Sequence, residues 1–137
     1  MSEPQFEAQS SRNRVPSQRL SDDHGVLFDL NAEVAGLGAQ ENRPKQNEPR
    51  ITSMLVKHPE LRIVLVTMLA GTTWDDHKTD ARISVQPLHG QIKFKTSGST
   101  VDLRAGQLLV LDPGVSHSVE AVEESAFLLT IVPPSQK

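Results

Sequence analysis

From residue 50 onward, short apolar segments alternate with turn residues, and this spacing constrains the fold more than any other feature of the sequence. Short strands at regular spacing, joined by turns that contain Gly or Pro, are typical of an all-β sandwich or barrel. No helix-length amphipathic pattern interrupts the series. We therefore predict an all-β domain over residues 50–134. Its expected strands cover residues 51–56, 61–69, 83–88, 91–95, 100–103, 107–111, 115–122 and 126–132.

Three sequence features of this region lead to specific structural predictions. Residues 61–69 are almost continuously apolar, which predicts a strand buried on both faces. Pro87 falls within an expected strand and has no N–H to donate, so we expect it at a sheet edge, a bulge or a strand end. Residues 71–81 are polar, and we predict a loop there.

The N-terminal third has a different amino-acid composition. Residues 1–25 are rich in Ser, Gln, Arg and Asp and cannot bury enough apolar surface to offset the entropy of ordering, which predicts a flexible polar tail. Residues 26–49 form an arm and loop in this interpretation. Within it, Asn31 is expected to cap a short helical turn that reaches toward Ala39 and is soon ended by glycine.

Composition excludes several classes of function. The chain has no cysteine, so it has no disulfide, no thiolate nucleophile and no Cys-ligated metal. The net charge is −3 without a basic face, which argues against a nucleic-acid partner. The longest apolar run, residues 63–70, is far too short to span a membrane. The first residues do not resemble a secretory signal, and we expect a cytoplasmic protein that binds neither membrane nor nucleic acid.

Two segments that each begin with a glycine, residues 71–90 and 106–117, carry the most specific pattern. Their spacing resembles the two signature motifs of the cupin superfamily, G-x5-H-x-H-x3-4-E-x6-G and G-x5-P-x-G-x2-H. The resemblance spans roughly residues 50–132 and implies a cupin-like double-stranded β-helix, a jelly-roll barrel of two antiparallel sheets. It also implies a homodimer. The matching residues are Gly71, His77 and Gly90 in the first segment and Gly106, Gly114 and His117 in the second.

In the cupin family the matched histidines are metal ligands, so the resemblance implies that His77 and His117 would hold a divalent transition metal. The chain departs from the family at two of the four usual ligand positions. Thr79 stands at the second histidine position and Ile83 at the glutamate position. A neutral hydroxyl is a poor ligand and an aliphatic side chain is none. Asp112 also replaces the usual proline.

Other residues could complete or shape such a site. His89 is a weaker candidate ligand, at barrel-facing parity but next to a turn. Asp75 and Asp76 precede His77 and could reach the mouth of a pocket. Trp74 is the only tryptophan, and it would form a wall of that mouth or serve as a loop anchor. The remaining histidines, His24 and His58, are expected on the surface.

Three functions remain open at this point. The first is a barrel that binds a small molecule, with or without a divalent metal. The second is a metal-dependent enzyme of the dioxygenase or isomerase type, with a metal-free epimerase using a histidine as general base as a variant. The third is a non-catalytic scaffold or interaction dimer that pairs through residues 51–56 and 61–69. The ligand-binding residues expected under the first are His77, Thr79, Ile83, His117 and Trp74.

Overall fold

A computed structural model describes residues 17–19, 25–39 and 49–135 of the chain. Two compact units divide the chain, residues 1–47 and residues 48–137. Most of the tail predicted over residues 1–25 lies outside the described ranges. Within the described part, no helix is long and apolar enough to cross a membrane.

In its described residues, the N-terminal unit contains a small two-stranded sheet and a helix. Strand β1 (Ser17–Arg19), which lies within the predicted tail, pairs antiparallel with β2 (Val26–Phe28). Helix α2 (Leu30–Ala39) follows directly. The Asp29 side chain caps it, since its Oδ1 accepts from the Ala32 N–H at 3.1 Å. The prediction that Asn31 is the cap was wrong, and the glycines inside the segment do not end the helix early.

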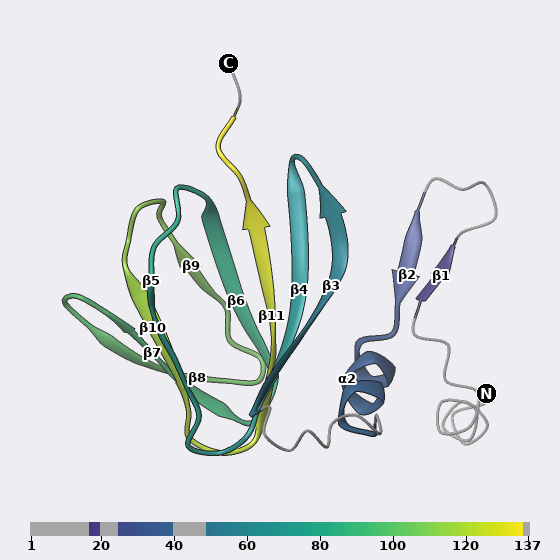
Figure 1. The fold of residues 1–137 in the computed structure, drawn as a ribbon, viewed down its shortest axis with the longest axis horizontal. Coiled ribbons are helices and arrows are strands. Elements are labelled where there is room, and N and C mark those ends of the chain that lie inside the picture. The colour runs from purple at the N-terminus through teal and green to yellow at the C-terminus, as the bar shows by residue number, and fades with distance from the viewer. Residues whose placement is uncertain (1–16, 20–24, 40–48, 136–137) are drawn as a thin grey trace. The chain divides into compact units, whose positions relative to one another are not determined.

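The second unit is all-β, as predicted, and its strands form two sheets (Figure 1). One sheet has five strands in the order β3-β4-β11-β6-β9, and the other has four in the order β5-β10-β7-β8. Every paired strand runs antiparallel to its neighbour. The strands are β3 (Arg50–His58), β4 (Leu61–Met68), β5 (Thr73–His77), β6 (Arg82–His89), β7 (Gln91–Thr96), β8 (Thr100–Arg104), β9 (Leu109–Leu111), β10 (His117–Ala121) and β11 (Ser125–Val132).

The segment over residues 71–81 differs from its prediction as a loop, because it contains strand β5. This strand is polar and lies at the edge of the four-stranded sheet, where it pairs only with β10. Local composition gives no strand signal in such a case, because pairing with a neighbour far along the chain decides the conformation. The difference matters because β5 carries two of the expected site residues.

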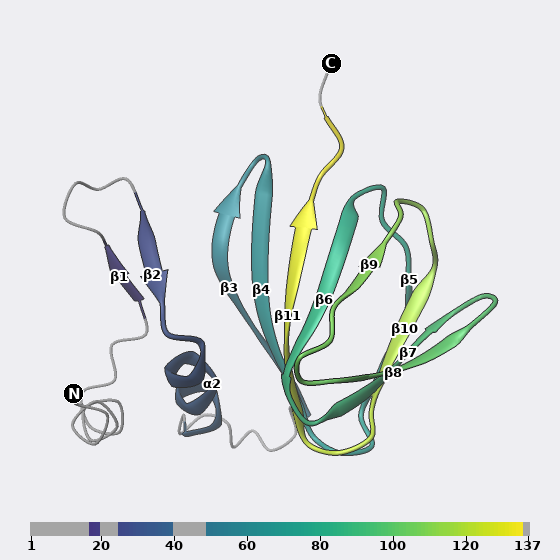
Figure 2. The same ribbon diagram turned by 180° about the vertical axis from the view of Figure 1, so that it is seen from behind.

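Both sheets contribute side chains to one core. Alternation along each strand sends every second residue inward, and β11, which lies between β4 and β6 in both views, supplies Phe127 (Figures 1 and 2). Residues 64–68 of β4 are all buried, which confirms the expectation of a strand covered on both faces. The other core residues include Val64, Val66, Met68, Ile83, Val85, Ile92, Phe94, Leu103, Val119 and Ala121.

Pro87 lies where its missing N–H does least damage. Its partner on β11 is Phe127, next to a register shift between Ala126 and Phe127. On the other side, β6 pairs with β9 only over residues 83–85, so the ladder has already ended. The expectation of a bulge or strand end at this proline is therefore confirmed.

Candidate functional site

Strand pairing brings the two matched histidines together. In the register of β5 with β10, His77 is the direct partner of His117. Their ring centroids are 4.3 Å apart, and the planes meet edge to face at 71°. Direct cross-strand partners have their Cβ atoms close enough to interact. The contact therefore follows from the backbone register, and it joins the segments 71–90 and 106–117.

Each imidazole is oriented by a hydrogen bond to its own chain. The Nδ1–H of His77 donates to the Asp75 carbonyl at 2.8 Å, and that of His117 donates to the Val115 carbonyl at 2.9 Å. A carbonyl can only accept, so Nδ1 carries the proton in both rings. In the neutral imidazole this assigns the lone pair to Nε2.

The pair belongs to a longer row of rings, which we name the ring cluster: Trp74, His77, His117 and Phe94. The Trp74 and His77 centroids are 5.2 Å apart, and Phe94 stacks on His117 at 5.2 Å with planes only 19° apart. His117 and Phe94 are buried, whereas Trp74 and His77 are half-buried. The cluster thus runs from the surface into the core, with His77 and Trp74 at its accessible end.

Arg50 extends the ring cluster at that accessible end. Its guanidinium carbon lies 4.3 Å from the centroid of the Trp74 ring, a cation–π arrangement. Arg50 begins β3 and Trp74 belongs to β5, which are edge strands of different sheets, so the contact links the two sheets. Within the described part of the chain, the buried Arg50 Nε has no hydrogen-bond partner. Nothing near Arg50 in the chain marks it as functional, so it was not expected at the site.

Phe94 was also not expected at the site, although a signal existed. The alternation of Ile92 and Phe94 with lysines predicts that both point inward from β7. The register of β10 with β7 then places Val119 opposite Phe94 and His117 opposite Thr96, so Phe94 is a near neighbour of His117 on the inward face. Only the pairing of the strands could reveal that the ring stacks on the histidine.

Thr79 and Ile83 take different structural positions. The Thr79 Oγ1 accepts from the Ala81 N–H at 3.1 Å, and its carbonyl accepts from the Gly114 N–H at 2.8 Å. The Thr79 hydroxyl therefore supports the turn before β6. Ile83 is only 5% exposed and packs in the core of the barrel.

The remaining expected ligands are not gathered at the ring cluster. His89 and His58 are exposed at the ends of β6 and β3. The Asp112 carboxylate is exposed and pairs with the Arg82 guanidinium at 2.7 Å. Asp75 is exposed, and its carbonyl orients His77. The side chain of Asp76 and the whole of His24 lie outside the described residues.

These donors do not fit the metal site that the cupin resemblance implies. Within the described ranges, no group of three or more His, Asp or Glu side chains could hold a metal ion. Two imidazoles remain, and the position of the family glutamate is an isoleucine packed in the core. Protein metal sites ordinarily use three or four protein ligands. The described side chains therefore supply about half of the required set.

The barrel is similar in structure to several solved proteins. A conserved protein of unknown function from Streptococcus pyogenes is 25% identical, with a TM-score of 0.60 over 64% of this chain and 76% of that one. A cupin 2 conserved barrel domain protein from Leptotrichia buccalis is 27% identical, with a TM-score of 0.60 over 64% of this chain and 42% of that one. Salicylate 1,2-dioxygenase from Pseudoaminobacter salicylatoxidans is 17% identical, with a TM-score of 0.67 over 79% of this chain and 34% of that one.

Further similar structures are also cupin superfamily proteins or RmlC-like cupins. No family model and no curated protein matches the sequence. The likeness in structure confirms the cupin-like jelly-roll barrel that the glycine and histidine spacing predicted. At these identities it shows the fold, while the similar proteins themselves range from unknown function to a dioxygenase.

Proposed function

We propose that this chain, whose barrel has the cupin fold, is a small-molecule-binding protein and that its binding site is the accessible end of the ring cluster. The observation that carries the proposal is the contact between the His77 and His117 rings, 4.3 Å apart, beside Trp74. Two imidazoles and an indole offer large planar faces together with polar ring nitrogens. Small-molecule sites combine apolar surface with a few placed polar groups in this way.

The gradient of burial in the ring cluster supports this interpretation. His117 and Phe94 are 4% and 2% exposed and would form the floor of a site, whereas Trp74 and His77 remain partly open to a ligand. The backbone bonds at both Nδ1 atoms hold the rings in fixed orientations before any ligand arrives. Pre-ordered side chains lower the entropic cost of binding.

The test is a screen of a small neutral and charged fragment library against the full chain by ligand-observed NMR. We expect fragments that bind the wild-type protein and lose most of that binding in the Trp74→Ala and His77→Ala variants. His89→Ala is the matched control, because His89 is an exposed histidine in the same segment and outside the ring cluster. Binding that is equal in all four proteins, or no binding at all, would exclude this site.

A metal-dependent enzyme is the second candidate, and one observation favours it. Histidines that ligate metals usually donate the other ring N–H to a carbonyl or carboxylate, and both His77 and His117 do so through Nδ1. The candidate still needs further ligands beyond the described ones. Mass spectrometry of the protein after reconstitution with Fe, Mn, Zn, Ni and Cu tests it. Metal retained by the wild type but not by the His77→Ala, His117→Ala double variant would favour the enzyme.

A further inference from the structure

We infer that the ligand of the ring cluster is a small organic carboxylate and that Arg50 is the residue that selects its charge. The inference rests on the proposed function and adds the chemical class of the ligand. The inference starts from an unpaired hydrogen-bond donor on the charged Arg50 side chain. The guanidinium is always charged and has five N–H donors, yet its buried Nε has no hydrogen-bond partner among the described residues.

No carboxylate of the described residues compensates this charge. The ion pairs within the described ranges are Arg82–Asp112, Lys93–Asp102 and Lys95–Glu120, and none of them involves Arg50. A buried donor left unpaired costs the free energy of its lost hydration, and the cost is larger for a charged group. The Trp74 face offsets part of this cost through the cation–π contact, but an aromatic face accepts no conventional hydrogen bond.

The geometry points to a planar anion as the missing partner. A guanidinium that lies over an aromatic ring still holds its N–H groups in its own plane, where they can meet a carboxylate in two parallel hydrogen bonds. Nε itself is buried, but Arg50 as a whole is only half-buried, so a carboxylate would approach the terminal N–H groups of the guanidinium from the surface. Trp74 contacts both Arg50 and His77: the Arg50 Cζ lies 4.3 Å from the Trp74 ring centroid, and the Trp74 and His77 ring centroids are 5.2 Å apart. A ligand bonded to Arg50 would therefore place its body against Trp74 and His77.

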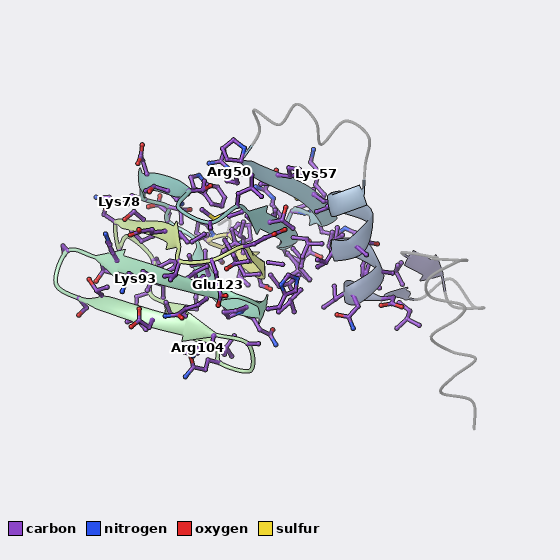
Figure 3. The ribbon with its side chains drawn as sticks, turned by 90° about the horizontal axis from the view of Figure 1, so that it is seen from below. Arg50, Lys57, Lys78, Lys93, Arg104 and Glu123 are labelled. Atoms are coloured by element: carbon purple, nitrogen blue, oxygen red, sulfur yellow. The ribbon has the colours of Figure 1, made fainter. Side chains whose placement is uncertain are left out.

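Two other cations of the barrel, Lys93 and Arg104, serve for comparison with Arg50. Lys93 and Arg104 lie on the hairpin of β7 and β8, away from Arg50 (Figure 3). Lys93 is already paired with Asp102 at 3.2 Å. Arg104 is exposed at the end of β8. Substitution of such a residue is therefore a suitable control for substitution of Arg50.

The experiment compares benzoate with benzamide, which share a ring and nearly a shape but differ in charge. Trp74 is the only tryptophan and the chain has no tyrosine, so its fluorescence reports directly on the site. We expect wild-type protein to bind benzoate about 10- to 100-fold more tightly than benzamide, the usual effect of a charge-assisted hydrogen bond. Arg50→Gln should lower that ratio to about one through the loss of benzoate affinity, with benzamide affinity retained.

Two further variants separate selectivity from structural damage. Arg104→Gln removes an exposed cation from the same barrel and should leave the ratio unchanged. Arg50→Lys keeps the charge without the planar fork and should retain part of the preference, with the remainder weakening as NaCl is raised. Arg50→Lys therefore keeps the test available if Arg50→Gln does not fold.

The possible failures are distinguishable. Equal affinities for benzoate and benzamide would overturn the assignment of a carboxylate, and a ratio that survives Arg50→Gln would overturn the role of Arg50. The proposed small-molecule site stands in both cases. If benzoate, benzamide, cyclohexanecarboxylate and cyclohexanecarboxamide all leave the Trp74 fluorescence unchanged, both the carboxylate and the site are wrong. A preference that disappears equally in Arg104→Gln would show general attraction to positive charge and would also overturn the role of Arg50.

Discussion

The two segments that begin with a glycine, residues 71–90 and 106–117, have similar parts but differ in how tightly those parts are packed. Each contributes one histidine to the ring cluster, and each contains glycines with positive φ. In the first segment the histidine is half-buried and the closing glycine, Gly90, has no room for a side chain. In the second segment the histidine is buried and the glycines face open space.

This difference shows that a segment can match a family motif poorly and still contain the positions that tolerate substitution least. The first segment has lost two of the family's ligand positions, yet it contains the glycine that least tolerates a change. The second segment keeps its glycine and histidine spacing. Its glycines have positive φ but no close neighbours, so only the backbone conformation opposes a side chain there. The segments are also joined to each other, because the Gly114 N–H donates to the Thr79 carbonyl at 2.8 Å and Ile83 pairs with Leu111.

The largest effect expected from this comparison is that of Gly90→Ala. Gly90 has a φ of +87°, and a Cβ there would lie 2.6 Å from the Ser125 Cα and nearer still to its Oγ. Ser125 cannot easily move, because its Oγ accepts from the Gln91 N–H at 3.0 Å and donates to the Glu123 carbonyl at 2.7 Å. Overpacking and an unfavourable φ together should lower the free energy of unfolding by about 3–5 kcal/mol, measured by urea denaturation.

Gly106→Ala is the matched control for this prediction. Gly106 has a φ of +93°, but a Cβ at this position would meet no neighbouring atom within 4 Å, so only the backbone cost applies. We expect a loss of about 1–2 kcal/mol. Equal losses for the two variants would show that the crowding at Ser125 relaxes, and the proposed difference between the segments would then be wrong.

The second prediction compares the two histidines. His117→Ala removes a ring that is 4% exposed and that stacks on Phe94, so it should lower the free energy of unfolding by about 2–3 kcal/mol. His77→Ala removes a half-buried ring from the rim and should cost about 1 kcal/mol or less. Urea denaturation of the two variants measures both values. If His77→Ala proved the more damaging, His77 would be a structural residue and a poorer candidate for ligand contact.

Much of the barrel could be predicted because its signals are local. Turn glycines at regular intervals and apolar strands between them mark the fold. Strand alternation places Ile83 and Phe94 inside. Both features depend on neighbours within a few residues, which sequence patterns record well. The meeting of the segments that carry His77 and His117 was instead implied by the resemblance to the cupin motifs, and the pairing of β5 with β10 shows it.

The parts that escaped prediction depend on partners far along the chain. Strand β5 is polar, and its pairing with β10 defines it. Arg50 meets Trp74 only because the edges of two sheets come together there. In the sequence Gly90 resembles the other turn glycines, and only the folded chain shows that Ser125 lies close enough to exclude a side chain there. These contacts join residues that no short pattern connects, so the charge and crowding at the site could be found only in the folded chain.

The smallest effect is expected for the ion pair that also links the two segments. Asp112, which stands where the cupin motif has proline, binds the Arg82 guanidinium at 2.7 Å, but both side chains are more than half exposed. Water and salt screen such a pair, so Asp112→Asn should lower the free energy of unfolding by about 0.5 kcal/mol or less, and by less still in high salt. Asp102→Asn, which breaks the Lys93–Asp102 pair inside one hairpin, is the control and should cost about the same. A much larger loss for Asp112→Asn would mean that this pair, more than the buried contact of His77 with His117, holds the two segments together.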